Sequence, residues 1–194
     1  MRSKTLSADG GRRFILVFDP GEEVMARLTE FAVELGISAA SFTGIGAFSD
    51  VKLGYFDWEA KGYRPIALDE QVEVLALTGD VALDDGEPSV HAHVVVGRHD
   101  GSAAGGHLLA AHVRPTLELV FTEAPVELRK RYDRETGLAL IDLADDRGGE
   151  VDLPQVPEID VAGGQVRAVV EAEETPRSSG EEGGAADSAN AEPG

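Results

Sequence analysis

The sequence contains no cysteine among its 194 residues. This absence excludes a disulfide framework and any thiolate metal site, so a metal would have to be held by histidine or carboxylate side chains. Long apolar runs are also missing, and none approaches the roughly 20 residues that a helix needs to cross a bilayer. Residues 1–11 are polar and lack the apolar centre of a secretory signal peptide. We therefore expect a soluble, cytoplasmic protein with no membrane partner.

Basic residues are scarce, and lysine is the scarcest of them. The chain has 17 Lys and Arg against 36 Asp and Glu, a formal net charge of −19, and only four of the basic residues are Lys. A negative surface repels phosphate backbones, which argues against nucleic-acid binding by simple electrostatics and leaves only a local basic patch for it. An acid-rich chain that prefers Arg to Lys also resembles the proteins of salt-loving archaea, a hypothesis that predicts weaker folding at low salt.

Aromatic residues are missing from the last quarter of the chain. Residues 144–194 contain no Phe, Trp or Tyr, include eight Gly, and carry 3 basic against 13 acidic side chains. Such a segment cannot bury enough apolar surface to offset the entropy lost on ordering. We therefore predict a folded domain over residues 1–143, with a net charge of −9, and an acidic, largely disordered tail over residues 144–194.

One segment has the features of a helix. Asp19-Pro20-Gly21-Glu22 offers a capping aspartate, a proline for the first turn and a glutamate that completes a capping-box pattern. Gly36 is a suitable C-terminal cap. Between them, four apolar residues recur at helical spacing: Val24, Leu28, Phe31 and Leu35. The pattern predicts one main helix over about residues 20–35, packed on a sheet.

Most of the remaining sequence up to residue 143 reads as short strands and turns. Ile37–Ala47 and Phe48–Trp58 are predicted as two strands with a turn near Ser49, and Gly106–Val113 and Thr116–Phe121 as two more. Short turns between strands favour antiparallel pairing. We therefore predict an α+β fold, a single compact domain with an antiparallel sheet of about seven or eight strands and one flanking helix.

The histidines supply the strongest functional pattern, in the run SVHAHVVVGRHDGSAAGGHLLAAHV. His91 and His93 share one face of a strand, and a glycine-rich reversal returns His107 on the next strand. Three neutral imidazoles with one open position are typical of a zinc site. We predict a metal site at these three residues, with zinc preferred and another late transition metal as the alternative. A polar hydrogen-bonding cluster is the competing interpretation.

The other candidate residues around this site are less specific. His99 lies beside a turn, and in a regular strand His112 would face away from His107, so both are left out of the site. A zinc-bound water could support hydrolysis if Glu73 or Glu118 acted as a base. Either glutamate could instead pair with an Arg or face water. Catalytic residues and enzymatic activity are left open.

Two further patterns favour structural interpretations. Gly44-Ile45-Gly46 lacks the third glycine and the following helix of a phosphate-binding loop, so a bulge or a close backbone approach is preferred. Arg129-Lys130-Arg131 and Arg134 could contact an anion or nucleic acid. Their acidic neighbours favour a solvated, salt-bridged segment.

The order of the motifs resembles the plants-and-prokaryotes conserved (PPC) domain, which is also found in plant AT-hook nuclear-localised proteins. The resemblance covers about residues 3–143 and rests on the segments SFTGIGAFSDVKLGYFD, EVLALTGDVAL, PSVHAHVVVGRHDGSAAGGHL, TLELVF and RYDRETGLALIDL. It implies a compact α+β domain, a homotrimer, and a metal, commonly zinc, bound by residues that here are His91, His93 and His107.

The resemblance also orders the functional hypotheses. Prokaryotic members are often described as DNA-binding, but the Arg-Gly-Arg hook that contacts DNA in the plant proteins is absent from this sequence. The leading hypothesis is a homotrimer whose three-histidine metal site binds or acts on a small molecule. The alternatives are a DNA-binding or transcription-associated protein, and a structural or recruiting trimer without catalysis whose acidic tail meets a basic partner.

Overall fold

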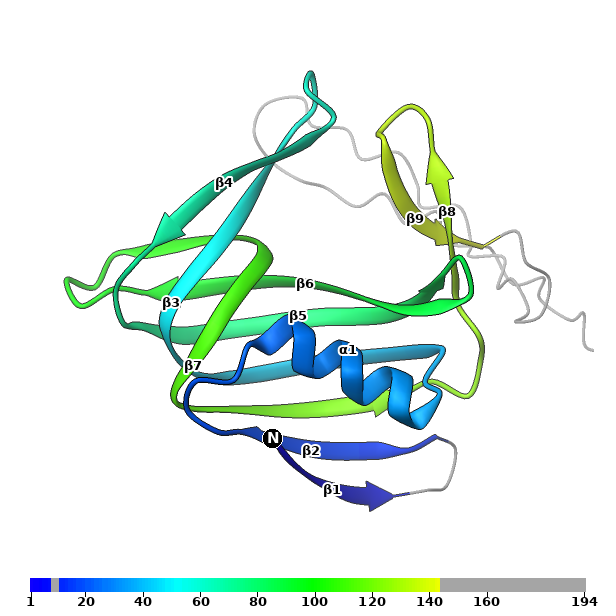
Figure 1. Cartoon of the computed structure of the whole chain (residues 1–194), viewed down its shortest axis with the longest axis horizontal. Coiled ribbons are helices and arrows are strands. Elements are labelled where there is room, and N and C mark those ends of the chain that lie inside the picture. Colours follow the sequence, from blue (N-terminus) through cyan, green and yellow to red (C-terminus); the bar gives the residue numbers. More distant parts are fainter. Residues whose placement is uncertain (8–10, 144–194) are drawn as a thin grey trace, which may run out of the picture. The chain divides into compact units, whose positions relative to one another are not determined.

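The computed structural model describes residues 1–7 and 11–143, which form one mixed sheet of nine strands and a single α-helix (Figure 1). The predicted α+β class is confirmed. The predicted acidic tail, residues 144–194, lies outside the described residues. In chain order the elements are β1 (Arg2–Ser7), β2 (Arg13–Phe18), α1 (Val24–Leu35), β3 (Ala39–Asp57), β4 (Gly62–Leu68), β5 (Val72–Asp84), β6 (Glu87–Gly97), β7 (Ala103–Glu123), β8 (Arg129–Asp133) and β9 (Leu138–Asp142).

The sheet curls because its longest strands pair with different neighbours along their length. The hydrogen-bonded order is β1-β2-β7-β3-β5-β8-β9, while β4 pairs with β3 and β6 joins β5 to β7. Strands β3, β5, β6 and β7 therefore form a closed circuit of ladders. The pairing is antiparallel except where Leu83 of β5 meets Arg129 of β8 in parallel. This circuit brings the beginning of β7 against β6, where the histidines lie.

Two pairs of predicted strands are in fact single long strands. β3 continues through Ser49, which was expected in a turn, because the register with β7 shifts between Phe48 and Asp50 and Ser49 is accommodated as a β-bulge. β7 continues through Pro115, which lies opposite another register shift. A proline at a bulge interrupts no ladder hydrogen bond, so it does not end the strand.

Three short strands bring the total to nine. The polar strand β1 pairs with β2 at one end of the sheet order, and polar edge strands carry no apolar alternation to mark them in the sequence. Strands β8 and β9 form a hairpin whose turn is held by Asp133. Its carboxylate accepts hydrogen bonds from the backbone N–H groups of Glu135 and Thr136, each at 3.1 Å.

Helix α1 begins at Val24 rather than near Pro20, so the predicted start is wrong. Gly21 has a φ of 84°, a left-handed conformation that interrupts a helix. The N-cap is Glu23, whose carboxylate accepts a hydrogen bond of 2.6 Å from the backbone N–H three residues later. The predicted end is right, because Gly36 closes the helix with a φ of 62°.

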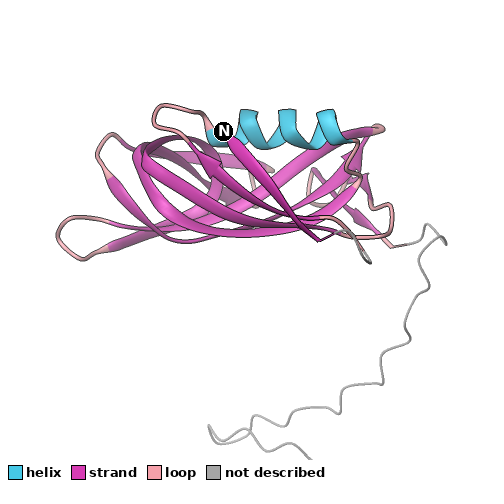
Figure 2. Cartoon of the chain, turned by 90° about the horizontal axis from the view of Figure 1, so that it is seen from below, coloured by secondary structure: helices cyan, strands magenta, loops and turns pink. Residues whose placement is uncertain are grey.

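The core lies between α1 and the sheet face that it covers (Figure 2). Phe31 of the helix packs edge-on against Phe14 and Phe121, with ring centroids 5.2 and 5.5 Å apart, and Phe42 stacks on Phe121 at 5.8 Å. One face of the sheet is therefore covered, and the histidine cluster lies outside this core.

Across the described part of the chain, no helix combines the length and apolar character needed to cross a membrane.

Candidate metal centre

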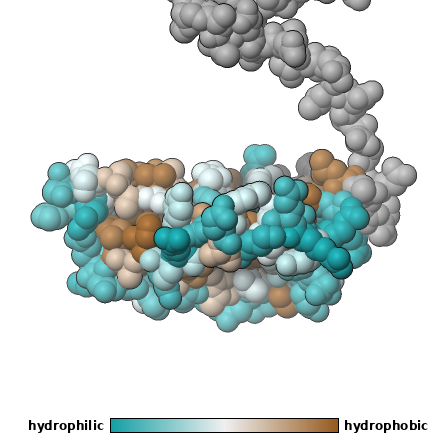
Figure 3. All heavy atoms as spheres, turned by 90° about the horizontal axis from the view of Figure 1, so that it is seen from above, coloured by the Kyte–Doolittle hydropathy of each residue, from teal (hydrophilic) through white to brown (hydrophobic). Residues whose placement is uncertain are grey.

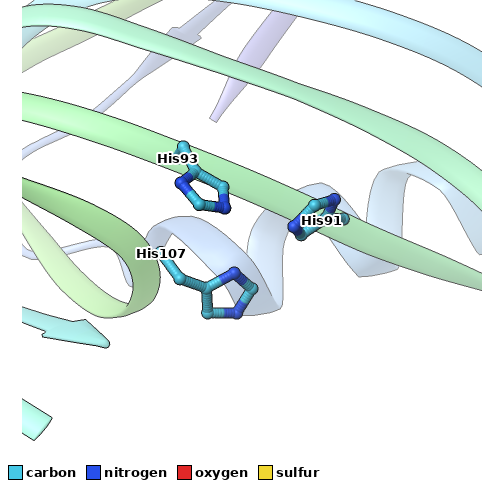
Figure 4. Close-up of side chains that lie close together, drawn as sticks. All are labelled: His91, His93 and His107. Atoms are coloured by element: carbon cyan, nitrogen blue, oxygen red, sulfur yellow. The ribbon is translucent and has the colours of Figure 1, made fainter. Parts of the chain in front are cut away.

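The three histidines predicted as ligands lie on two strands that pair directly. His91 and His93 belong to β6, and His107 lies near the beginning of β7. His93 and His107 are cross-strand partners, and the two-residue period of β6 puts His91 on the same face as His93. Figure 4 shows the three rings grouped around one space. The fold thus brings together the side chains to which the spacing pointed.

The distances suit a shared ion. Each imidazole offers one nitrogen, and these three nitrogens lie within 4.8 Å of one another. The ring centroids are 5.2 Å apart for His91 and His93, 5.2 Å for His91 and His107, and 5.4 Å for His93 and His107. In a tetrahedral site, two metal–nitrogen bonds of about 2 Å place their nitrogens about 3.3 Å apart. The rings would therefore have to move inward for all three nitrogens to bind one ion.

The surroundings keep two of the imidazoles neutral. Burial is the main cause that lowers the pKa of His107 to about 4, and electrostatic repulsion by its neighbours, among them the ammonium of Lys130, adds to it. Loss of solvent and repulsion from His91 also lower the pKa of His93. A neutral imidazole keeps a lone pair for a metal, whereas an imidazolium has none. At neutral pH these rings therefore do not need to lose a proton before they bind an ion.

The donor set fits a late transition metal on two further observations. The Nδ1 atom of His107 is buried and has no hydrogen-bond partner, a costly state that a bound cation would relieve. The Nδ1 atom of His91 lies 3.2 Å from Oδ2 of Asp80. A carboxylate at that distance holds the proton on Nδ1 and leaves Nε2 free to bind a metal.

Asp80 and Tyr63 hold two of the rings, a role that the sequence did not indicate. Asp80 faces His91 across the β5–β6 ladder. The ring of Tyr63 stacks on His107 with centroids 4.3 Å apart. The same ring lies against Gly54, where an added Cβ would come within 2.8 Å of Cδ1 of Tyr63. Both contacts depend on strand register, which the spacing of residues in one sequence does not reveal.

The other two histidines lie outside the cluster. His99 is exposed in the turn between β6 and β7. His112 lies 2.9 Å from Oδ1 of Asp50, and this hydrogen bond raises the pKa of His112. The expectation that His112 faces away from His107 assumed a regular strand, but β7 contains a bulge between them and both side chains point away from the core. His112 is separated from the three-histidine cluster by its position along β7, and its ring is hydrogen-bonded to Asp50 instead.

The two glutamates considered as general bases lie away from the histidine cluster. Glu73 and Glu118 are exposed and line a separate concavity with Ile45, and neither borders the concavities that contain the histidines. Gly44 and Gly46 of the neighbouring motif pass so close to β7 that a Cβ at either position would collide with its backbone. This agrees with a close backbone approach and not with a phosphate-binding loop.

The basic segment on β8 divides into two kinds of side chain. Arg129 pairs with Glu127 at 2.5 Å, and Arg131 pairs with Asp142, as expected for a salt-bridged segment. Lys130 instead donates to Oγ of Ser89 at 3.2 Å. It borders a concavity of about 520 Å³ that is also lined by His91 and His107. One residue of the basic cluster therefore belongs to the surroundings of the histidines.

Comparison with known proteins agrees with the fold. The profile of the Plants and Prokaryotes Conserved (PCC) domain matches residues 5–125. A plant- and prokaryote-conserved (PPC) protein from Pyrococcus horikoshii is 34% identical, with 73% of this chain and 94% of that chain covered and a TM-score of 0.65. No curated protein matches the sequence.

Two other similar structures carry functional descriptions. A metal-containing protein from Archaeoglobus fulgidus is 35% identical, with 71% of this chain and 98% of that chain covered and a TM-score of 0.64. A candidate DNA-binding protein from Ralstonia eutropha JMP134 is 32% identical, with 72% of this chain and 96% of that chain covered and a TM-score of 0.65.

Proposed function

We propose that His91, His93 and His107 bind a metal ion, with zinc preferred. The chain belongs to the Plants and Prokaryotes Conserved domain family, and a similar structure is that of a metal-containing protein. The observation that carries this proposal is the buried, unpartnered Nδ1 of His107, a residue with a ring nitrogen within 4.8 Å of a ring nitrogen of His91 and of His93. Three histidines leave a zinc ion an open position, so the centre serves to bind or act on a small molecule.

The protein's own residues would prepare such a centre in distinct ways. Asp80 fixes the orientation of His91, and Tyr63 covers one face of His107. A zinc ion with an open position can polarise a bound oxygen atom or activate a water. Asp80 lines both concavities that contain the histidines. Its carboxylate is hydrogen-bonded to His91, so Asp80 is a positioning residue.

Elemental analysis of the purified full chain tests the metal. We expect one ion per chain, retained through gel filtration. The variant His91→Ala should lose the ion while its circular dichroism spectrum stays that of the wild type, because His91 is a partly exposed residue outside the core. Wild-type protein that holds no metal, and takes up none from equimolar zinc, would overturn the proposal.

We further propose that the protein is a homotrimer, as the family resemblance implies. Four exposed apolar side chains support a subunit contact: Ile45 (64% exposed), Leu75 (56%), Val95 (44%) and Val120 (40%). Ile45 and Leu75 border one concavity, and Ile45 and Val120 border another, so at least three of these side chains are neighbours on the surface. The face of the molecule shown in Figure 3 is largely hydrophilic, and its apolar side chains lie in separate areas.

Sedimentation equilibrium tests the assembly. We expect three times the mass of one chain for the wild type, and a smaller species for the double variant Ile45→Glu, Val120→Glu. The double variant Lys4→Gln, Lys52→Gln is the matched control, because it changes the net charge by the same two units at exposed lysines. A monomeric wild type would contradict the proposed trimer.

DNA binding is the second candidate function, because the similar protein from Ralstonia eutropha is described in that way. The net charge of −9 over residues 1–143 opposes it. A mobility-shift assay at low salt decides between the two candidates. We expect no retarded DNA, and a retarded band that disappears as salt is added would favour the DNA-binding alternative.

A further inference from the structure

A concavity of about 520 Å³ lies beside the histidine cluster and is framed by two hairpins. Its lining includes Ser89, His91 and His107 from the strands of the sheet, Tyr63 from β4, and residues of the β8–β9 hairpin. This volume is within the range of about 300–1,000 Å³ that is usual for small-molecule sites. The concavity therefore has room for a ligand considerably larger than a water molecule.

The two hairpins are fixed to each other above this concavity. The Nζ atom of Lys61, in the β3–β4 turn, donates to the backbone carbonyl of Arg134 in the β8–β9 turn at 2.9 Å. A Cβ added to Gly137 would lie 3.1 Å from the Cβ of Lys61, which shows how closely the two turns approach. Figure 1 shows the two turns on the same side of the sheet. The hairpins thus hold a shaped wall beside the cluster.

One side of this wall is positively charged. Lys130 reaches from β8 to Ser89, where its Nζ lies 3.2 Å from Oγ and 3.4 Å from the carbonyl oxygen. Among the described residues, Lys130 makes no ion pair, unlike Arg129 and Arg131 beside it. An ammonium held by neutral oxygens next to a ligand-sized space is available to an anion.

The other side of the wall is apolar. It consists of four consecutive residues at the beginning of β9, namely Leu138, Ala139, Leu140 and Ile141, together with Val90 of β6. Leu140 and Ile141 are 44% and 41% exposed, so their apolar surface is open to an occupant. A ligand that matches both sides has an anionic group and a hydrocarbon body.

The charges around the concavity favour a ligand with a single anionic group. Its lining contains the two carboxylates of Asp80 and Asp84 and the one ammonium of Lys130. A divalent ion at the proposed centre would change the local balance from one negative charge to one positive charge. We propose that this concavity binds a small organic monocarboxylate, with its carboxylate at Lys130 and its hydrocarbon body against β9. The inference rests on the proposed metal centre, which supplies the positive balance.

Calorimetric titration of the zinc-loaded full chain tests the inference with a defined probe. The probe is 4-methylpentanoate, and 4-methylpentanamide is the neutral compound of the same shape. We expect the carboxylate to bind about tenfold or more tightly than the amide, because a charge-assisted contact at Lys130 is lost in the amide. Acetate, which lacks the hydrocarbon body, should also bind at least about tenfold more weakly.

Two lysine variants localise the site. Lys130→Gln should weaken binding of 4-methylpentanoate about tenfold or more while the affinity for the amide and the zinc content remain unchanged. The matched control is Lys52→Gln, at an exposed lysine of β3 outside the concavity, and it should bind as the wild type does. Removal of zinc with a chelator should abolish carboxylate binding.

The outcomes separate this inference from the proposed function. A chain that takes up no zinc overturns both. Three results with the zinc-loaded chain would overturn the carboxylate site alone and leave the metal centre unaffected. They are no binding of 4-methylpentanoate, equal affinities for the carboxylate and the amide, and an affinity of Lys130→Gln for the carboxylate that equals that of the wild type.

Discussion

His107 and His112 lie on the same strand, β7, and their surroundings are opposite. His107 is packed against Tyr63 beside two other imidazoles, and its pKa is lowered to about 4. His112 is exposed, lies 2.9 Å from Oδ1 of Asp50, and has a raised pKa. The first environment preserves a lone pair and the second stabilises a cation. The comparison shows that partners and solvent, rather than the residue type, determine which histidines are suited to a metal.

Alanine at each of these histidines tests the comparison most strongly. We expect His107→Ala to lose the bound metal completely, because it removes one of three ligands, and His112→Ala to retain one ion per chain. Elemental analysis after gel filtration measures both variants. The far-ultraviolet circular dichroism spectra should match, because both side chains point away from the core. Equal metal content in the two variants would remove the distinction between the sites.

A smaller effect should follow from the two carboxylates. Asp80 contacts His91 of the cluster, and Asp50 contacts His112. We expect Asp80→Asn to lower metal affinity by about 10- to 100-fold, because a carboxylate behind a ligating imidazole fixes its orientation and raises its basicity. The control variant Asp50→Asn should leave metal affinity unchanged. Competition with a chromogenic zinc chelator gives the two affinities, and an unchanged value for Asp80→Asn would show that Asp80 is not a positioning residue.

The sequence was informative where a pattern is local. The two-residue period predicts that His91 and His93 share a face, and the glycine-rich segment before His107 predicts a return toward them. The apolar stripe through Phe31 likewise predicts α1. In each case one element and its immediate turn determine the outcome, so no information about distant strands is needed.

Contacts between distant strands were beyond the sequence. Asp80 reaches His91 because β5 and β6 pair in one register, and Lys130 reaches Ser89 across more than forty residues of chain. A shift of one residue in either ladder would turn these side chains to the other face. The boundary of the folded domain near residue 143 and the acidic tail beyond it stay predictions, since they concern residues outside those described.

Acid should weaken the metal-free protein through His107. Its pKa is about 4 when folded and near 6.5 when unfolded, so the unfolded chain binds a proton first as the pH falls. Stability is therefore lost between about pH 6.5 and 4, and it rises with pH in that window. Urea unfolding of the chelator-treated protein should show a falling midpoint over this range. The variant His107→Gln should remove part of the fall, and an identical pH profile in that variant would show that His107 does not cause the loss of stability in acid.

The opposite dependence, and the smallest effect, is expected at His112. Its folded pKa is raised by Asp50, so its contribution to stability is complete below about pH 6.5 and is lost as the pH rises through the raised value. The pair is about half exposed, so solvent screening limits the contribution to about 0.5 kcal/mol or less. His112→Gln should lower the urea midpoint slightly at pH 5.5 and leave it unchanged at pH 8.5. A larger loss at pH 8.5 than at pH 5.5 would reverse the sign and show that His112 is held in its neutral form, as His107 is.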